Sequence, residues 1–84
     1  MYKLKLKQTA ERDLRRLPTA VLQRINEQIL ALRHNPRPSG VKKLQGHLTG
    51  WRIRVGDYRI VYQIDDTVQT VTIIRVRHRR DVYR

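Results

Sequence analysis

Three arginines stand close together in a stretch that is otherwise rich in apolar residues. Arg52 and Arg54 alternate with apolar residues, and Arg59 follows after the pair Gly56-Asp57. In an extended strand, side chains two residues apart project from the same face. Arg52 and Arg54 therefore share a face, and Arg59 joins them if the two strands form a hairpin in the matching register. Guanidinium groups stay charged and donate hydrogen bonds in pairs, so this pattern predicts binding of phosphate.

A strand that alternates arginine with apolar residues can also be an ordinary solvated outer face. Against that reading, residues 51–64 contain three arginines and only one acid, Asp57. A face built only for solubility mixes both signs of charge. Residues 75–84 add five more arginines. Such basic tails are commonly disordered electrostatic arms, but the apolar residues in this one favour docking beside the open face.

The charge balance of the whole chain points in the same direction. The 84 residues include 19 lysines and arginines against seven acids, which gives a formal net charge of +12. Such a chain repels itself unless nucleic acid, an anionic membrane or an acidic protein supplies the opposite charge. No segment approaches the ~20 apolar residues of a membrane span, and the N-terminus lacks the apolar run of a secretory signal. We therefore expect a cytoplasmic protein with a polyanionic partner and no membrane.

The composition also limits the available chemistry. The chain has no cysteine and three scattered histidines, so it lacks both a disulfide framework and the ligand pattern of a common zinc site. We expect no metal and no other cofactor. At this length we expect one domain with a single, mostly aliphatic core.

The first part of the chain predicts one strand and two helices. Residues 2–7 alternate apolar residues with lysines, which is typical of a half-buried strand at a sheet edge. Thr9 is a plausible N-cap for a short helix that ends at Pro18. A second helix follows, because apolar residues recur along one face. They are Leu22, Ile25, Ile29 and Leu32.

The second part predicts an irregular loop and then three strands. Prolines and glycine in residues 35–46 favour an irregular connection. The strands expected after it form an antiparallel meander with turns at Gly56-Asp57 and Asp65-Asp66. They are Trp51–Val55, Tyr58–Ile64 and Val68–Val76. We predict an α+β fold in which two N-terminal helices pack on one face of a small antiparallel sheet, in the order β-α-α-β-β-β.

Several motifs in the second part of the chain carry a family resemblance. They are Lys43-Leu44-Gln45-Gly46, the strand from Trp51 to Val55, the segment from Gly56 to Gln63, and the segment from Arg77 to Tyr83. With the order of elements, they resemble the RelE/ParE superfamily of toxins from bacterial and archaeal toxin–antitoxin pairs. The resemblance implies a fold like that of small microbial ribonucleases. It also implies one RelE-like toxin domain over residues 1–84, with 77–84 as a basic C-terminal tail.

The RelE-like branch of this family implies a ribosome-dependent endoribonuclease that cuts messenger RNA and inhibits translation. Carried over by position, the catalytic residues are Arg59 and Arg79, which handle the phosphate, and Tyr83, the acid/base residue. The expected RNA contacts are Lys43, Arg52, Arg54 and Arg77. Arginine is a poor general base, so the strand arginines would act by electrostatic stabilisation. His78 is the alternative acid/base residue.

The resemblance also implies partners and leaves alternatives open. The expected partners are an acidic, RelB-like antitoxin, messenger RNA in the ribosomal A site, and ribosomal RNA. We expect a hetero-oligomer with the antitoxin and a monomeric free toxin. The alternative activity is that of a ParE-like poison of DNA gyrase, and a further alternative is a nucleic-acid-binding module without catalysis.

Overall fold

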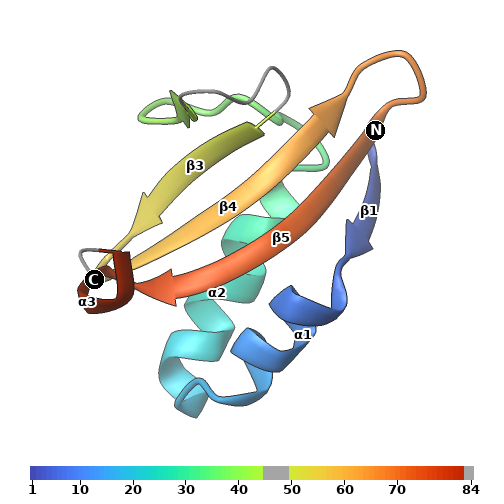
Figure 1. The fold of residues 1–84 in the computed structure, drawn as a ribbon. Helices are drawn as coiled ribbons and strands as arrows, with labels where there is room; N and C mark the ends of the chain where they lie inside the picture. The colour runs from blue at the N-terminus through green and yellow to red at the C-terminus, as the bar shows by residue number, and fades with distance from the viewer. Residues whose placement is uncertain (45–49, 83–84) are drawn as a thin grey trace.

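The computed structural model describes residues 1–44 and 50–82, which form one sheet with the two N-terminal helices on one of its faces and a short third helix at its end (Figure 1). In chain order the elements are β1 (Lys3–Leu6), α1 (Gln8–Arg15), α2 (Thr19–Ala31), β2 (Lys42–Lys43), β3 (Gly50–Val55), β4 (Tyr58–Asp65), β5 (Thr70–His78) and α3 (Arg79–Val82). The strand order across the sheet is β1-β5-β4-β3-β2. The α+β architecture and the three-strand meander predicted from the sequence are confirmed. Within the described ranges, no helix is long and apolar enough to cross a membrane.

The sheet is mixed, whereas the sequence pattern predicted a wholly antiparallel one. β1 lies at one edge, as its lysines suggested, but it runs parallel to β5, with Lys3 opposite Thr70 and Leu6 opposite Ile73. Alternation of apolar and polar residues identifies a strand without fixing the direction of its partner. The chain order decides the direction of β1, because α1 follows β1 directly and packs beneath the sheet.

Two further details of the strands differ from the prediction. β5 covers Thr70–His78 instead of 68–76, because residues 66–69 form the turn and Tyr58 and Arg59 of β4 pair with His78 and Arg77. The predicted tail from residue 77 therefore begins inside the sheet. The predicted loop contains a two-residue strand, β2, which pairs with β3. A segment so short shows no periodicity that the sequence could reveal.

The core lies between the helices and the covered face of the sheet. Ile25 and Ile29 of α2 and Leu32 at its C-cap are buried, which confirms three of the four residues of the predicted apolar stripe. The fourth, Leu22, is only partly buried. The strand residues that the stripe faces are also buried; they are Ile53, Ile60, Tyr62, Ile64, Val71, Ile73 and Val76. The Tyr62 hydroxyl donates to the Pro36 carbonyl at 2.8 Å, and burial raises the pKa of Tyr62 to about 12.

Helix α1 covers the part of β5 that β1 leaves open. Its N-cap is Lys7 and not Thr9 as predicted; the Thr9 hydroxyl instead donates to the Ile74 carbonyl at 2.6 Å. One turn further on, Asp13 accepts the Val76 backbone N–H at 2.8 Å and the Arg75 Nε at 2.9 Å. Residues four apart share a helix face. α1 therefore satisfies backbone groups of β5 beyond Ile73, where the pairing with β1 ends.

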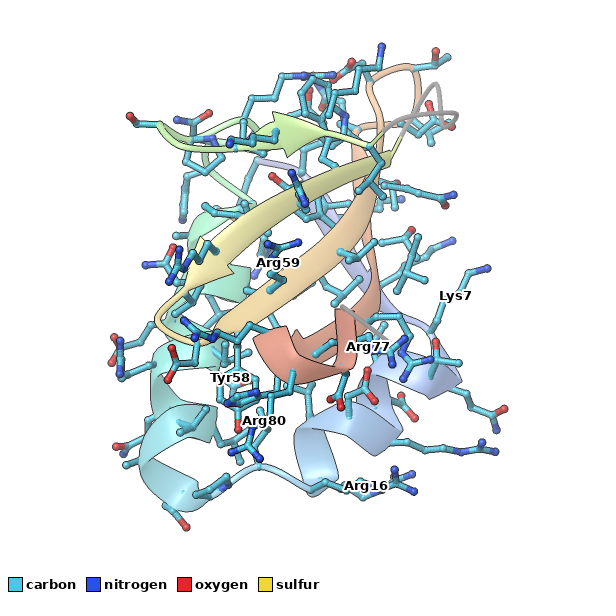
Figure 2. The ribbon with its side chains drawn as sticks, turned by 60° about the vertical axis from the view of Figure 1, so that its left-hand side comes forward. Lys7, Arg16, Tyr58, Arg59, Arg77 and Arg80 are labelled. Atoms are coloured by element: carbon cyan, nitrogen blue, oxygen red, sulfur yellow. The ribbon has the colours of Figure 1, made fainter. Side chains whose placement is uncertain are left out.

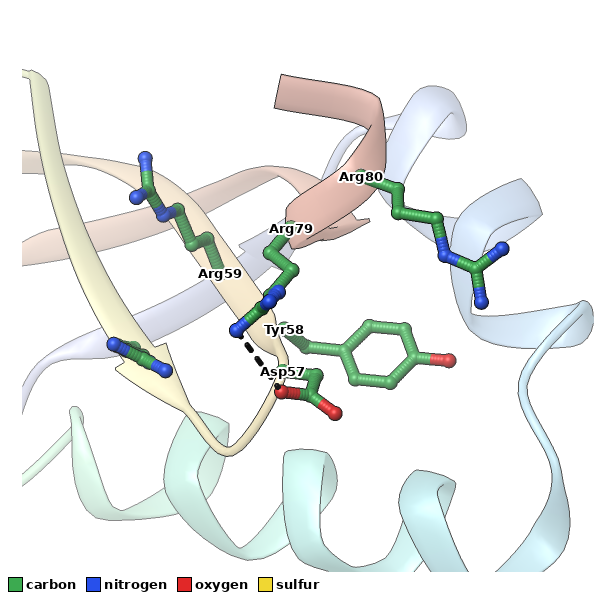
Figure 3. A pocket seen from close by; sticks show the side chains of 6 residues that line it. Asp57, Tyr58, Arg59, Arg79 and Arg80 are labelled. Atoms are coloured by element: carbon green, nitrogen blue, oxygen red, sulfur yellow. Dashed lines mark ion pairs between the residues drawn. The ribbon is translucent and has the colours of Figure 1, made fainter. Parts of the chain in front are cut away.

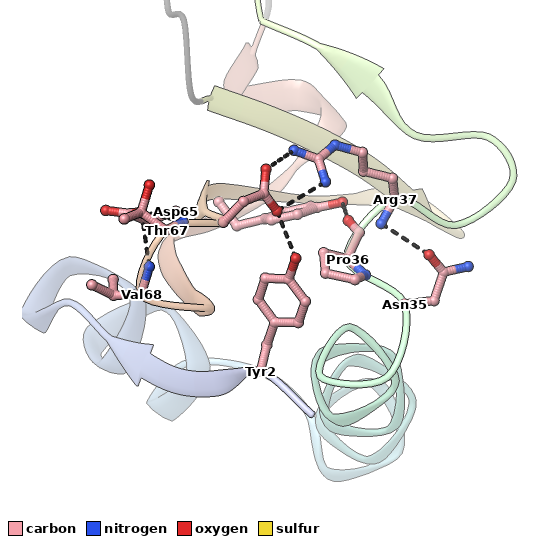
Figure 4. Close-up of polar contacts among 9 residues, drawn as sticks. Tyr2, Asn35, Pro36, Arg37, Asp65, Thr67 and Val68 are labelled. Atoms are coloured by element: carbon pink, nitrogen blue, oxygen red, sulfur yellow. Dashed lines mark hydrogen bonds and ion pairs between the residues drawn. The ribbon is translucent and has the colours of Figure 1, made fainter.

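A polar cluster holds the proline-rich loop against the far end of the sheet (Figure 4). Asp66 accepts the Tyr2 hydroxyl at 2.6 Å and pairs with Arg37 at 2.8 Å. Hydrogen bonds from Arg37 and Tyr2 lower the pKa of the Asp66 carboxyl. The Arg37 guanidinium also lies 5.0 Å from the centre of the Trp51 ring. These contacts fix the loop that leads into β2.

Candidate nucleic-acid interface

Three arginines from three neighbouring strands stand side by side in the sheet. Arg54 of β3 is directly opposite Arg59 of β4, and Arg59 is directly opposite Arg77 of β5. The next row of the sheet is Ile53, Ile60 and Val76, whose side chains are buried beneath the helices. Because neighbouring residues of a strand face opposite ways, the arginine row lies on the open face. The hairpin register predicted for Arg54 and Arg59 is thus confirmed.

The arginine row opens into a hollow at the end of the sheet that carries α3 (Figures 2 and 3). This basic hollow has a volume of about 440 Å³. Its lining residues are Arg54, Asp57, Tyr58, Arg59, Arg79 and Arg80. Among the described lining residues, four guanidinium groups thus meet one carboxylate, so this part of the hollow is strongly positive. Like charges placed opposite one another destabilise a sheet, and a bound anion would relieve that repulsion.

The turn between β3 and β4 positions two of these arginines. The Gly56 carbonyl accepts the Arg54 Nε at 2.9 Å, and the Asp57 carbonyl accepts the Arg79 backbone N–H at 2.7 Å. The Asp57 carboxylate also lies 3.9 Å from the Arg79 guanidinium, with both side chains more than half exposed. Gly56 has a φ of +59°, a conformation that glycine adopts without the steric cost other residues pay. The turn chemistry therefore sets where Arg54 and Arg79 stand.

A second hollow lies on the other side of α3, toward α1. It has a volume of about 320 Å³, and Arg77 and His78 are among its lining residues, as are Tyr58 and Asp81. His78 Nδ1 accepts the Arg80 backbone N–H at 3.2 Å, and its ring meets Tyr58 edge to face at 5.1 Å between centres. His78 is not among the residues that line the basic hollow. The geometry therefore favours a role for His78 in holding the start of α3.

The remaining residues proposed from the sequence are divided among different places. Arg52 lines a smaller hollow beside the basic one, together with Arg54 and Arg59. The Lys43 ammonium lies 5.9 Å from the centre of the Trp51 ring. Lys43 lines neither the basic hollow nor this smaller hollow beside it. Tyr83 lies outside the described residues. The structure thus brings Arg54, Arg59 and Arg79 together and places Arg77 beside Arg59 in the sheet.

Sequence reasoning missed several residues of this surface. Arg80 and Tyr58 line the basic hollow beside the predicted arginines, and Asp57 supplies its carboxylate. Arg80 stands in the arginine-rich end of the chain, but its neighbours gave no reason to choose it. Asp57 was identified only as a turn residue, since the contact with Arg79 depends on where α3 begins.

This arrangement is suited to holding a phosphate group and stabilising added negative charge. Arginine forks donate paired hydrogen bonds to phosphate oxygens, and preorganised positive groups stabilise a phosphate that gains charge in a transition state. Arginines bring neither a nucleophile nor a base of suitable pKa. A proton acceptor must therefore come from another group.

Comparison with known proteins identifies the family. Residues 4–83 match the model of the ParE toxin of type II toxin-antitoxin system, parDE. The chain is 41% identical over 85 residues to the toxin RelG of Mycobacterium tuberculosis, covering 99% of this chain and 97% of the relative.

Solved structures agree with the sequence relatives. The toxin–antitoxin complex RelBE2 of Mycobacterium tuberculosis has a chain that matches with a TM-score of 0.81 and 37% identity, covering 92% of this chain and 96% of that one. The isolated RelE toxin of E. coli matches with a TM-score of 0.81 and 26% identity, covering 93% and 84%. The family match, the curated relatives and the shared fold therefore establish that this chain belongs to the RelE/ParE superfamily of type II toxin–antitoxin toxins, within its RelE-like branch.

Proposed function

We propose that this toxin is a ribosome-dependent endoribonuclease that cuts messenger RNA in the A site and so inhibits translation. The observation that supports the proposal is the basic hollow, where Arg54, Arg59, Arg79 and Arg80 surround a space large enough for a phosphate group and its neighbouring sugar. The similarity to toxins named RelE and RelG supports the same activity.

The proposed reaction breaks one phosphodiester bond of the RNA. The ribose 2′-oxygen attacks the adjacent phosphorus, its proton passes to a base, and the bond from phosphorus to the 5′-oxygen breaks. The departing 5′-oxygen takes up a proton, which leaves a 2′,3′-cyclic phosphate and a free 5′-hydroxyl. Arg59 and Arg79 would stabilise the charge on the pentavalent phosphate, and Arg54 would support it from the neighbouring strand. The reaction needs no metal ion.

Tyr83 is the proposed acid/base residue, on the strength of its position in the motif shared with the family. A tyrosine has an ordinary pKa of about 10, and neighbouring guanidinium groups would lower it and make the phenolate easier to form. Arginines cannot align the attacking 2′-oxygen by themselves. We therefore propose that the ribosome holds the messenger RNA in line, which predicts weak cleavage of free RNA.

The proposed partner in the cell is an acidic antitoxin. Solved relatives of this chain include complexes of RelE with RelB from Pyrococcus horikoshii and Methanococcus jannaschii. An acidic chain laid over the arginine row would offset the net charge of +12 and cover the basic hollow. The free toxin would then be a cytoplasmic monomer and the inhibited form a hetero-oligomer.

Cleavage of a reporter messenger RNA in a translation extract tests the activity. The wild-type toxin should yield 5′-hydroxyl fragments, and both Arg59→Ala and Tyr83→Phe should abolish them. Arg12→Ala is the matched control, because Arg12 is an exposed arginine of α1 that lines none of the hollows described above. Cleavage that persists in Arg59→Ala and Tyr83→Phe would show that the site is assigned wrongly.

The family match to a ParE toxin supports one second candidate, inhibition of DNA gyrase. A gyrase poison would cause a DNA-damage response and leave reporter messenger RNA intact. Measuring plasmid supercoiling by purified gyrase beside the extract assay separates the two activities. A ribonuclease should act only in the extract, and a gyrase poison should act only in the supercoiling assay.

A further inference from the structure

A third hollow adjoins the basic hollow on the open face, and most of its described lining residues are cations. This β2 hollow has a volume of about 210 Å³. Its lining residues are Gly40, Lys42, Arg52, Arg54 and Arg59. Four of the five are cations and none is a carboxylate. Arg54 and Arg59 also line the basic hollow, so the two hollows share a wall and form one continuous cationic surface.

The short strand β2 brings Lys42 to this hollow. Lys42 is directly opposite Arg52 of β3, so the two side chains share the open face. The next residue, Lys43, is opposite Trp51, and its ammonium lies near that ring. The Asp66–Arg37 pair and the stacking of Arg37 on Trp51 hold the loop that forms β2. Lys42 therefore lies on the open face because these contacts hold the loop in place. A one-residue slip in the pairing of β2 with β3 would put Lys43 on the open face instead.

Placing Lys42 opposite Arg52, beside the row of Arg54 and Arg59, carries an electrostatic cost for the free protein. Directly opposed like charges are unfavourable in a sheet, and the described residues that line this hollow include no acid beside Lys42 and Arg52. In the basic hollow, by contrast, the Asp57 carboxylate faces Arg79. An anion in the β2 hollow would remove the repulsion.

We propose that the β2 hollow is a second phosphate subsite, in which Lys42 and Arg52 hold the phosphate next to the one that is cleaved in the basic hollow. The inference rests on the proposed function, since it assigns both phosphates to one RNA strand. An RNA backbone presents phosphates at every nucleotide, so two contiguous cationic hollows with a shared arginine wall fit consecutive phosphates. A substrate with two adjacent phosphates should therefore bind better than one with a single phosphate.

Binding of a fluorescent single-stranded RNA of 12 nucleotides, followed by anisotropy over a range of salt concentrations, tests the subsite. Lys42→Gln should weaken binding about 2- to 5-fold, as for loss of one exposed charge pair. It should also lower the slope of log affinity against log salt by about 0.7, the value for one phosphate contact on a single strand. Lys42→Arg should retain the wild-type slope. The matched control is Lys3→Gln, an exposed lysine on the opposite edge strand, which should leave the slope unchanged.

Several results would overturn the proposal. Equal slopes for Lys42→Gln and Lys3→Gln would show that Lys42 makes no phosphate contact, and a reduced slope in Lys43→Gln alone would move the contact to the other face of β2. If Lys42→Gln weakened binding of polyglutamate but not of RNA, the hollow would be a protein-docking surface. Matching thermal unfolding curves show that each variant is folded. RNA binding is measured without the ribosome, so a failure of messenger RNA cleavage in the extract remains distinguishable from a failure of the subsite.

Discussion

Replacing Asp13 with alanine should destabilise the fold strongly, although Asp13 stands on a surface helix. Its carboxylate accepts the Arg75 Nε at 2.9 Å and the Val76 backbone N–H at 2.8 Å. The Asp13 side chain is only 11% exposed, and that of Arg75 is 38% exposed. The two contacts fasten the segment of β5 that leads to Arg77 and α3.

The expected loss of stability is the sum of two costs, one for each hydrogen-bond partner that the Asp13 carboxylate leaves behind. The half-exposed Arg75 regains water, so its share resembles that of a surface ion pair, about 0.2–1 kcal/mol. The Val76 N–H would lose its acceptor, at a cost of about 1–3 kcal/mol for an unsatisfied buried group. Asp13→Ala should therefore lower the free energy of unfolding by roughly 1–4 kcal/mol. A chain of this length has a total stability of about 4–12 kcal/mol, so the loss would be large.

Urea denaturation followed by circular dichroism measures this loss. Asp13→Asn keeps an oxygen acceptor for Val76 and should lose only about 1–2 kcal/mol, while Arg75→Gln should lose less than about 1 kcal/mol. The double variant gives the coupling between the two side chains. If Asp13→Ala were no more destabilising than Arg75→Gln, the bond to the Val76 N–H would contribute nothing, and the reasoning would be refuted.

Three more expectations concern the turn at the basic hollow and the buried tyrosine. Asp57→Asn should tighten RNA binding, because among the described residues that line the basic hollow Asp57 alone carries a carboxylate. Glu27→Gln makes the same change of net charge at an exposed position of α2, and it should not match that gain in affinity in an anisotropy titration. Gly56→Ala should lower the free energy of unfolding, measured by urea denaturation, by about 1–2 kcal/mol, because the φ of Gly56 is +59°. An unchanged denaturation midpoint would contradict this backbone strain. Burial raises the pKa of Tyr62 to about 12. The stability that the protonated Tyr62 hydroxyl provides is therefore fully present below about pH 10 and is lost as the pH rises to 12. The stability difference between wild type and Tyr62→Phe should therefore shrink over that range, and a difference independent of pH would disprove the assignment.

The sequence predicted most elements because their burial pattern is local. The stripe of Ile25, Ile29 and Leu32 and the alternation around Arg52 and Arg54 each follow from the period of a single element. The two-residue strand β2 escaped prediction because it is too short to show a period. Thr9 was wrongly assigned as an N-cap, because its hydroxyl bonds to the Ile74 carbonyl, 65 residues away.

What the sequence determined by itself was the charge, the family motifs and which strand residues share a face. The alternation of residues fixes faces because the side-chain period of a strand is two. Only the tertiary structure decided which residues from different strands meet. The register sets Arg77 beside Arg59 and Lys42 beside Arg52, and the start of α3 brings Arg79 to Asp57. These meetings depend on turn geometry and on pairing between distant segments, so no single stretch of the chain encodes them.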